Sequence, residues 1–178
     1  MLRKREQEKK RKLATMQNKE LIIQRLKLEP HVEGGYFTRT FESSIQTSSS
    51  KFAMSSIYYL LTNEAPIGYF HQNKSDIIHF FHSGAPIKYF MVNPEGKLNT
   101  KILGPDLEQG HQFQLIVKGG DWKASQLMQK DESIKDFGLI SEAVCPGFEY
   151  KDMQLATLET FAKLHPRLID QIGHLIKN

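Results

Sequence analysis

The sequence contains a single cysteine, Cys145, among its 178 residues. An intramolecular disulfide and a cysteine-rich zinc site are therefore both excluded, which favours a reducing compartment. Long apolar runs are also missing, because none approaches the roughly 20 residues that span a bilayer. The first residues are charged where a signal peptide would be apolar. We therefore expect a cytoplasmic protein without a membrane partner.

Excess positive charge is confined to one end of the chain. The net charge is +4, and residues 1–12 carry seven Lys or Arg side chains against Glu6 and Glu8, a net of +5 that leaves −1 for the other 166 residues. A phosphate-binding face on the folded part has no support in this composition, so any nucleic-acid contact is expected from the tail. We predict that residues 1–17 form a disordered basic extension. The alternatives are a localisation signal and translated sequence upstream of a start at Met16.

Residues 18–178 are predicted to form one domain, because a domain typically has roughly 100 to 150 residues. A short helix is expected over residues 18–28, ended by Pro30. Strand-length runs of β-branched and aromatic residues then alternate with Gly- and Pro-rich turns until about residue 150. The predicted strands are residues 36–41, 56–61, 77–82, 87–92, 113–117 and 139–144. This pattern predicts an all-β, antiparallel barrel or sandwich.

A helical pattern returns from Leu155 and is interrupted at Pro166. Its apolar residues form one stripe, composed of Leu168, Ile169, Ile172, Leu175 and Ile176. We expect this C-terminal helix to pack on the barrel or on a partner subunit.

Two segments contain residues at intervals that resemble a known pair of motifs. The first motif reads His-x-His, then a Glu and a Gly at set intervals, and this chain has His71, Asn73, Ile77 and Gly84 at those positions. The second motif, Pro-x-Gly followed by a His, aligns with residues 118–123 and places Lys123 at the His position.

Two further stretches narrow the resemblance. Residues 30–37 (PHVEGGYF) and 144–150 (VCPGFEY) are similar to the opening and closing signatures of a branch of small single-domain cupins catalogued as a domain of unknown function. The resemblance covers about residues 20–160. It implies a jelly-roll barrel with short flanking helices, commonly a homodimer, with a small-molecule pocket inside the barrel and no settled activity. The chain departs from the branch at Ile77 and Arg39, which stand where an acid is usual.

A metal ion in a cupin needs about three imidazoles and a carboxylate converging on one point. Of the matching positions only His71 offers a good ligand, and the charge of Lys123 opposes a cation. His79 and His82 have opposite parity on an extended strand, so at most one of them can join His71. We predict no metal and no other cofactor.

Strand alternation predicts which side chains line the pocket. Ile77 and His79 should face inward, and Lys123 should face inward while Trp122 faces away. The predicted ligand-binding residues are Arg39, Tyr59, His71, Asn73, His79, Trp122, Lys123 and Glu149. This cationic and aromatic set suits an anionic or sugar-like ligand. Tyr59 and Trp122 could equally be packing residues, and Glu149 could pair with Arg39.

Three functions remain open from the sequence. The first is metal-independent binding of a small metabolite. The second is an enzyme similar to the metal-independent sugar-nucleotide epimerases and isomerases of the cupin superfamily, with His71 as base, Tyr59 as acid and a carboxylate to orient the base. Asp76 is near in sequence, but its parity places it off the pocket face. The third is an interaction protein whose barrel is filled by Phe70, Phe81 and Phe90.

Overall fold

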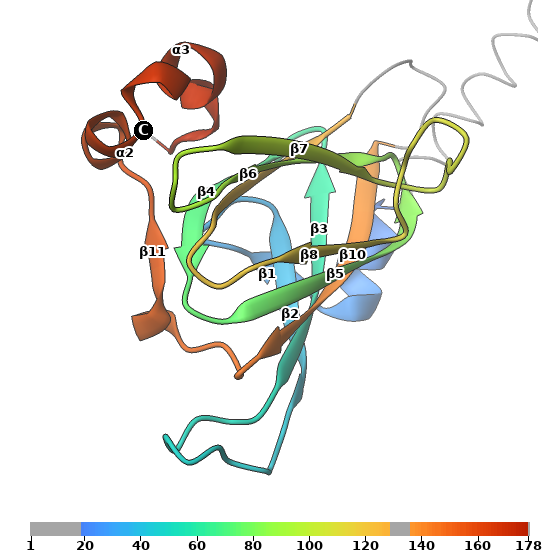
Figure 1. The fold of residues 1–178 in the computed structure, drawn as a ribbon. Helices are drawn as coiled ribbons and strands as arrows, with labels where there is room; N and C mark the ends of the chain where they lie inside the picture. Colours follow the sequence, from blue (N-terminus) through green and yellow to red (C-terminus); the bar gives the residue numbers. More distant parts are fainter. Residues whose placement is uncertain (1–18, 129–135, 178) are drawn as a thin grey trace, which may run out of the picture.

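Two antiparallel sheets face each other and enclose the interior of a barrel (Figure 1). The computed structural model describes residues 19–128 and 136–177, so the predicted basic extension lies outside the described residues. The first sheet has the order β1-β2-β3-β10-β5-β8, with bounds Glu29–Pro30, Tyr36–Glu42, Ser55–Thr62, Phe137–Cys145, Asp76–Gly84 and Gln114–Val117. The second sheet has the order β11-β4-β9-β6-β7, with bounds Met153–Leu155, Ile67–Asn73, Trp122–Leu127, Ile87–Val92 and Leu98–Leu103.

The six predicted strands correspond to β2, β3, β5, β6, β8 and β10. Among the strands that the sequence did not predict are β4 and β9, which neighbour each other in the second sheet. β4 begins at Ile67, inside a stretch that has the composition of a turn, and β9 contains Lys123 and Ser125. Polar inward positions therefore obscured the strand pattern in both.

The predicted alternation along β5 is confirmed. Ile77 and His79 are buried, whereas Asp76 and His82 are exposed. The same alternation directs Glu142 of β10 inward, because Glu142 is the direct cross-strand neighbour of His79. The barrel interior thus receives titratable side chains from adjacent strands of the first sheet.

The C-terminal segment covers the outer face of the second sheet (Figure 1). It contains α2 (Leu158–Leu164) and α3 (Ile169–Ile172), with short 3-10 turns at Tyr150–Asp152, Pro166–Leu168 and Gly173–Leu175. Phe161 of α2 is fully buried, and its ring centroid lies 5.0 Å from that of Phe70 and 5.9 Å from that of Trp122. Ile172 is also fully buried in this cluster. The predicted apolar stripe therefore packs on the barrel.

A helix over residues 19–26 packs on the first sheet. Its Ile22, Ile23 and Leu26 contact a cluster that contains Leu60 of β3 and Phe137 of β10. Within the described residues, no helix is long and apolar enough to cross a membrane.

Candidate functional site

A lysine side chain crosses the barrel interior and joins the two sheets. Lys123 of β9 places its Nζ 2.9 Å from Nε2 of His79 and 3.2 Å from both carboxylate oxygens of Glu142. His79 and Glu142 belong to the opposite sheet, and all three residues are buried. We call Lys123, His79 and Glu142 the lysine cluster.

The charges in the lysine cluster determine which of its groups are ionised. Burial opposes ionisation of Glu142, but the charge of Lys123 outweighs it and holds the pKa of Glu142 below its ordinary value. Burial and the charge of Lys123 lower the pKa of His79, so its imidazole is neutral. Nε2 of His79 therefore accepts a hydrogen bond from the Lys123 ammonium, whose other protons point at the Glu142 carboxylate.

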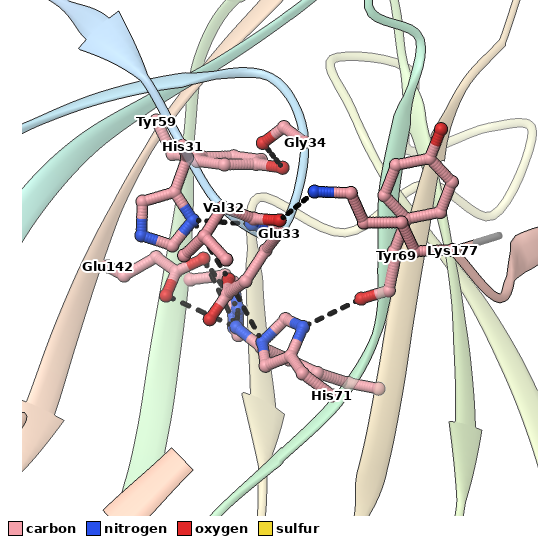
Figure 2. Close-up of polar contacts among 11 residues, drawn as sticks. His31, Val32, Glu33, Gly34, Tyr59, Tyr69, His71, Glu142 and Lys177 are labelled. Atoms are coloured by element: carbon pink, nitrogen blue, oxygen red, sulfur yellow. Dashed lines mark hydrogen bonds and ion pairs between the residues drawn. The ribbon is translucent and has the colours of Figure 1, made fainter. Parts of the chain in front are cut away.

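A tight turn between β1 and β2 brings Glu33 into the interior. Gly34 has φ 94°, and a Cβ added there would lie 2.2 Å from the carbonyl oxygen of Ile67, so a side chain is excluded at this position. The turn is held from two sides, because Tyr69 N–H donates to the carbonyl of Glu33 over 2.6 Å and the Lys177 ammonium donates to the carbonyl of Val32 over 3.1 Å (Figure 2). The Glu33 backbone is thereby fixed in place.

Glu33 and His71 form a buried pair in which a carboxyl oxygen faces an imidazole nitrogen. Nδ1 of His71 lies 2.8 Å from the carbonyl oxygen of Tyr69, which can only accept, so Nδ1 carries the imidazole proton (Figure 2). Nε2 of His71 then has a free lone pair, and it lies 3.2 Å from Oε2 of Glu33. A protonated Glu33 can donate to this nitrogen.

The surroundings of this pair favour its uncharged form. Burial raises the pKa of Glu33 to about 8, with the charge of Lys123 acting in the opposite direction. Burial and the charge of Lys123 together lower the pKa of His71 to about 3. At neutral pH the carboxyl is therefore mostly protonated and the imidazole neutral.

His31 precedes Glu33 in the same turn and has the opposite tautomer from His71. The backbone N–H of Glu33 donates to Nδ1 of His31 over 3.2 Å, so the imidazole proton of His31 is on Nε2. Burial lowers the pKa of His31 to about 4, which keeps the ring neutral. His31 thus presents an N–H donor that does not titrate near neutral pH.

A pocket lies beside these groups, with about 420 Å³ of space including its open mouth. Its walls combine apolar side chains with a few polar ones: His31, Glu33, Phe37, Arg39, Ile57, Asn73, Ile77, Glu142, Val144, Phe148 and Tyr150. Asn73 is 8% exposed, and its side-chain oxygen has no hydrogen-bond partner among the described residues. A buried polar atom of this kind costs stability unless a partner enters the pocket.

The structure places the predicted ligand-binding residues in the pocket wall, in the barrel interior or outside both. Arg39 and Asn73 line the pocket. His71, His79 and Lys123 are buried among the titratable groups of the barrel interior. Tyr59 also lies in the interior, where its hydroxyl donates to the carbonyl of Gly34 over 2.8 Å.

Trp122 and Glu149 lie elsewhere. Trp122 has the opposite parity from Lys123 on β9 and packs under α2. Glu149 is 2.9 Å from the ammonium of Lys151 and is not paired with Arg39, which instead contacts Glu42 and the carbonyl of Phe148. Phe70 and Phe90 also lie in the cluster under the C-terminal helices, so they do not fill the barrel.

The predicted His71 and Tyr59 acid–base pair receives little support from this geometry. Burial and the nearby Glu33 carboxyl raise the pKa of Tyr59 well above its ordinary value, which makes it a poor acid. Asp76 is exposed, as its strand parity predicted, and its carboxylate accepts a hydrogen bond from Lys118. The carboxyl group that contacts His71 is that of Glu33.

A metal ion does not fit the matching positions. The lysine ammonium stands where the second motif has an imidazole, and Ile77 offers no ligand atom. Among residues 19–128 and 136–177, no group of three or more His, Cys, Asp and Glu side chains is arranged to hold a metal ion.

Sequence reasoning gave no role to His31, Glu33 or Glu142 in the site. His31 and Glu33 belong to the opening signature, but one sequence contains nothing that places a turn inside a barrel. Glu142 had a usable signal, because it is the one acidic residue at an inward position of an otherwise apolar or small strand, β10. A single acid on a buried face is rare unless it is paired.

Comparison with known proteins gives consistent matches over most of the chain. Residues 20–156 match the family model described as "Cupin superfamily (DUF985)". An uncharacterized protein of Saccharomyces cerevisiae is 36% identical over 169 residues, which cover 87% of this chain and 78% of that protein.

Solved structures agree with these sequence matches. The crystal structure of a protein from Shewanella oneidensis is 32% identical, with a TM-score of 0.80, and the match covers 88% of this chain and 95% of that one. A cupin 2 conserved barrel domain protein from Rhodopseudomonas palustris has a TM-score of 0.53 at 12% identity, covering 84% of this chain and 86% of that one, and this likeness concerns the fold alone.

Proposed function

Because the chain belongs to the cupin superfamily, in the family described as DUF985, we propose that its barrel binds a small sugar-like molecule without a metal ion. The resemblance and the all-β barrel predicted from the sequence are confirmed. The observation that carries the proposal is the buried, unpartnered side-chain oxygen of Asn73 in the wall of the pocket. A ligand hydroxyl is a donor that would satisfy it.

The charges of the pocket favour a neutral or singly charged ligand. The two cations predicted to attract anions both have carboxylate partners, Glu142 for Lys123 and Glu42 for Arg39. Glu33 is mostly protonated at neutral pH because its pKa is about 8. The pocket therefore has little uncompensated positive charge, and Arg39 is the group that would accept one anionic substituent at the mouth.

The walls suit a sugar ring as well. Phe37 and Phe148 provide apolar surface for the C–H face of a ring, while Asn73, His31 and Glu33 provide hydrogen-bonding groups for its hydroxyls. The Lys123 ammonium occupies the position at which the second cupin motif has a histidine, and this supports binding without a metal ion.

Ligand binding can be tested by thermal shift with neutral sugars, sugar acids and sugar phosphates, in the presence of a chelator. We expect neutral sugars or singly charged sugar acids to raise the melting temperature most. The Asn73→Ala variant should bind about tenfold more weakly, equivalent to about 1.4 kcal/mol, because one buried hydrogen bond is lost. Asn99→Ala, at an exposed position on β7, is the matched control and should bind as the wild type does.

Two outcomes would contradict the proposal. One is a preference for multiply charged anions that is unchanged in Asn73→Ala. The other is loss of binding on treatment with the chelator.

We further propose that the protein is a homodimer that pairs through the outer face of β5, β8 and β10. Two cross-strand rows on this face contain no charged side chain: Ser56–Ala143–Ile78–Ile116 and Tyr58–Ser141–Phe80–Gln114. Ile116 is 54% exposed. A second copy can meet this face across a two-fold axis without opposing like charges.

Size-exclusion chromatography with light scattering tests the dimer. We expect a dimer for the wild type and a monomer for Ile116→Glu, which places two carboxylates in the interface. Leu107→Glu changes a residue that is 60% exposed in the loop before β8 and should leave the dimer intact. A monomeric wild type, or a dimer unaffected by Ile116→Glu, would exclude this interface.

A further inference from the structure

The turn that contains His31 and Glu33 brings two different chemical functions to one pocket. Glu33 is a carboxyl group that can carry a proton, and its Oε2 lies 3.2 Å from Nε2 of His71. His31 is a neutral N–H donor, because its Nδ1 accepts from the Glu33 backbone. Both side chains line the pocket. Simple binding requires hydrogen-bonding groups but does not require a buried carboxyl beside an imidazole lone pair.

We propose that this pocket catalyses proton transfer at a carbon next to the carbonyl group of a sugar-like substrate, with Glu33 carrying the proton and His31 and Asn73 holding the carbonyl oxygen. This inference rests on the proposed function, because it assumes that a sugar-like molecule enters the pocket.

The arrangement of Glu33 leaves one oxygen for a substrate. Its contacts with the ring nitrogens of His31 and His71, at 3.5 Å and 3.2 Å, are both made by Oε2. Within the described part of the chain, no hydrogen bond to Oε1 is present, although Glu33 lines the pocket. Oε1 is therefore the atom that would meet a substrate C–H bond.

The reaction needs no partner beyond the substrate. The Glu33 carboxylate forms an O–H bond as the C–H bond breaks, the electron pair of that bond becomes a C=C bond, and the carbonyl π pair moves to oxygen. The resulting enolate oxygen accepts hydrogen bonds from Nε2–H of His31 and the side-chain amide of Asn73. Return of the proton to the same carbon completes hydrogen exchange. Isomerisation requires in addition that the hydroxyl on that carbon passes its proton to the enolate oxygen, so that the new C=O bond forms there while Glu33 delivers its proton to the former carbonyl carbon.

His71 is a positioning residue in this scheme. Its Nδ1–H is bonded to the carbonyl of Tyr69, which aims the Nε2 lone pair at Glu33. The protonated carboxyl of Glu33 can donate to that lone pair, which holds Oε2 beside His71 and leaves Oε1 for the substrate. The neutral state of His31 also matters. A neutral imidazole is a very weak acid, so it can donate a hydrogen bond to the enolate oxygen without transferring its proton.

The expected pH dependence follows from the groups that face Glu33. Burial raises the pKa of Glu33 to about 8, Lys123 opposes this shift and Glu142 adds to it. Its carboxyl contacts His31 of the same turn and His71 of β4, and the other titratable groups of the barrel interior are Tyr59 of β3, His79 of β5, Tyr89 of β6, Lys123 of β9 and Glu142 of β10. Because Glu33 must be ionised to act as a base, the rate should rise about tenfold per pH unit below about pH 8 and level off above it.

The test is proton–deuterium exchange followed by NMR, with dihydroxyacetone, D-glyceraldehyde and D-fructose as probes in deuterated buffer. The wild type should exchange the hydrogen next to the carbonyl of at least one probe about a hundredfold faster than Glu33→Gln, with the pH profile described above. Glu29→Gln, at an exposed position on β1, is the matched control and should retain the wild-type rate. Glu33→Asp withdraws the carboxyl by one methylene and should exchange at least about tenfold more slowly, which covers the case in which Glu33→Gln does not fold.

The two proposals fail in different ways. A probe that raises the melting temperature but is not exchanged would overturn the catalytic inference and leave binding intact. Exchange that persists at the wild-type rate in Glu33→Gln would also overturn it. A protein that neither binds nor exchanges any of the sugars would overturn both.

Discussion

Replacing Lys123 by Met should destabilise the fold by about 3–5 kcal/mol, because the Glu142 carboxylate would remain in the barrel interior without its counter-charge. Both oxygens of Glu142 lie 3.2 Å from the Lys123 ammonium, and both residues are less than a tenth exposed. The Glu142 pKa, held low by Lys123, should rise in the variant, so the loss should be smaller in acid than at neutral pH. Urea unfolding at several pH values measures both effects.

Two further variants separate the charge effect from the loss of packing. The double variant Lys123→Met/Glu142→Leu removes both charges and should recover most of the lost stability, because a well-packed apolar pair can replace a buried ion pair. Lys118→Met breaks an exposed pair with Asp76 and should change stability by about 0–1 kcal/mol. A loss below about 1 kcal/mol in Lys123→Met would contradict the role assigned to the lysine cluster.

The contribution of Glu33 to the stability of the wild type should fall by about 2 kcal/mol between about pH 6.5 and pH 8. Burial raises the pKa of Glu33 from 4.5 to about 8, so between these values the folded state binds more protons at Glu33 than the unfolded state does. Stability therefore falls as the pH rises through this window.

The histidines act in the opposite direction at lower pH. Burial lowers the pKa of His31 and His71 from 6.5 to about 4 and about 3, so the unfolded state binds more protons at these rings. Their contribution to stability rises with pH and is complete above about pH 7.5, one unit above the ordinary histidine pKa of 6.5. Both rings are retained in Glu33→Gln, so the difference in stability between the wild type and this variant isolates Glu33.

Thermal or urea unfolding of Glu33→Gln checks this assignment. The variant should lose the decline between pH 6.5 and pH 8, because glutamine does not titrate, whereas Glu29→Gln should keep it. A decline of equal size in Glu33→Gln would show that another group titrates in this range.

The sequence predicted the strands with regular apolar patterns better than two of the strands that carry site residues. The strands around Ile57, Ile77 and Ile140 were predictable because β-branched and aromatic residues recur along them. β4 and β9 were missed because His71, Asn73 and Lys123 replace the apolar residues that mark a buried face. The same substitutions that build the site thus removed the pattern from which its strands could be recognised.

The sequence predicted the orientation of a site residue only where that residue lies on a strand. Parity placed His79 and Lys123 inward and Asp76 outward, as observed. It could not place Glu33, because the approach of a turn to the barrel interior depends on the close contact between Gly34 and Ile67, which are far apart in the sequence. It also could not reveal that each predicted cation has a carboxylate partner.

The ammonium of Lys123 is attached to the chain by covalent bonds, and this fixes its stoichiometry at one per barrel. A dissociable ion is present in proportion to its concentration in the surrounding medium, and a competing chelator can remove it. The positive charge that joins the two sheets here is supplied when the polypeptide is synthesised and cannot be exchanged afterwards. The number of these ammonium groups per barrel is thus set when the chain is synthesised.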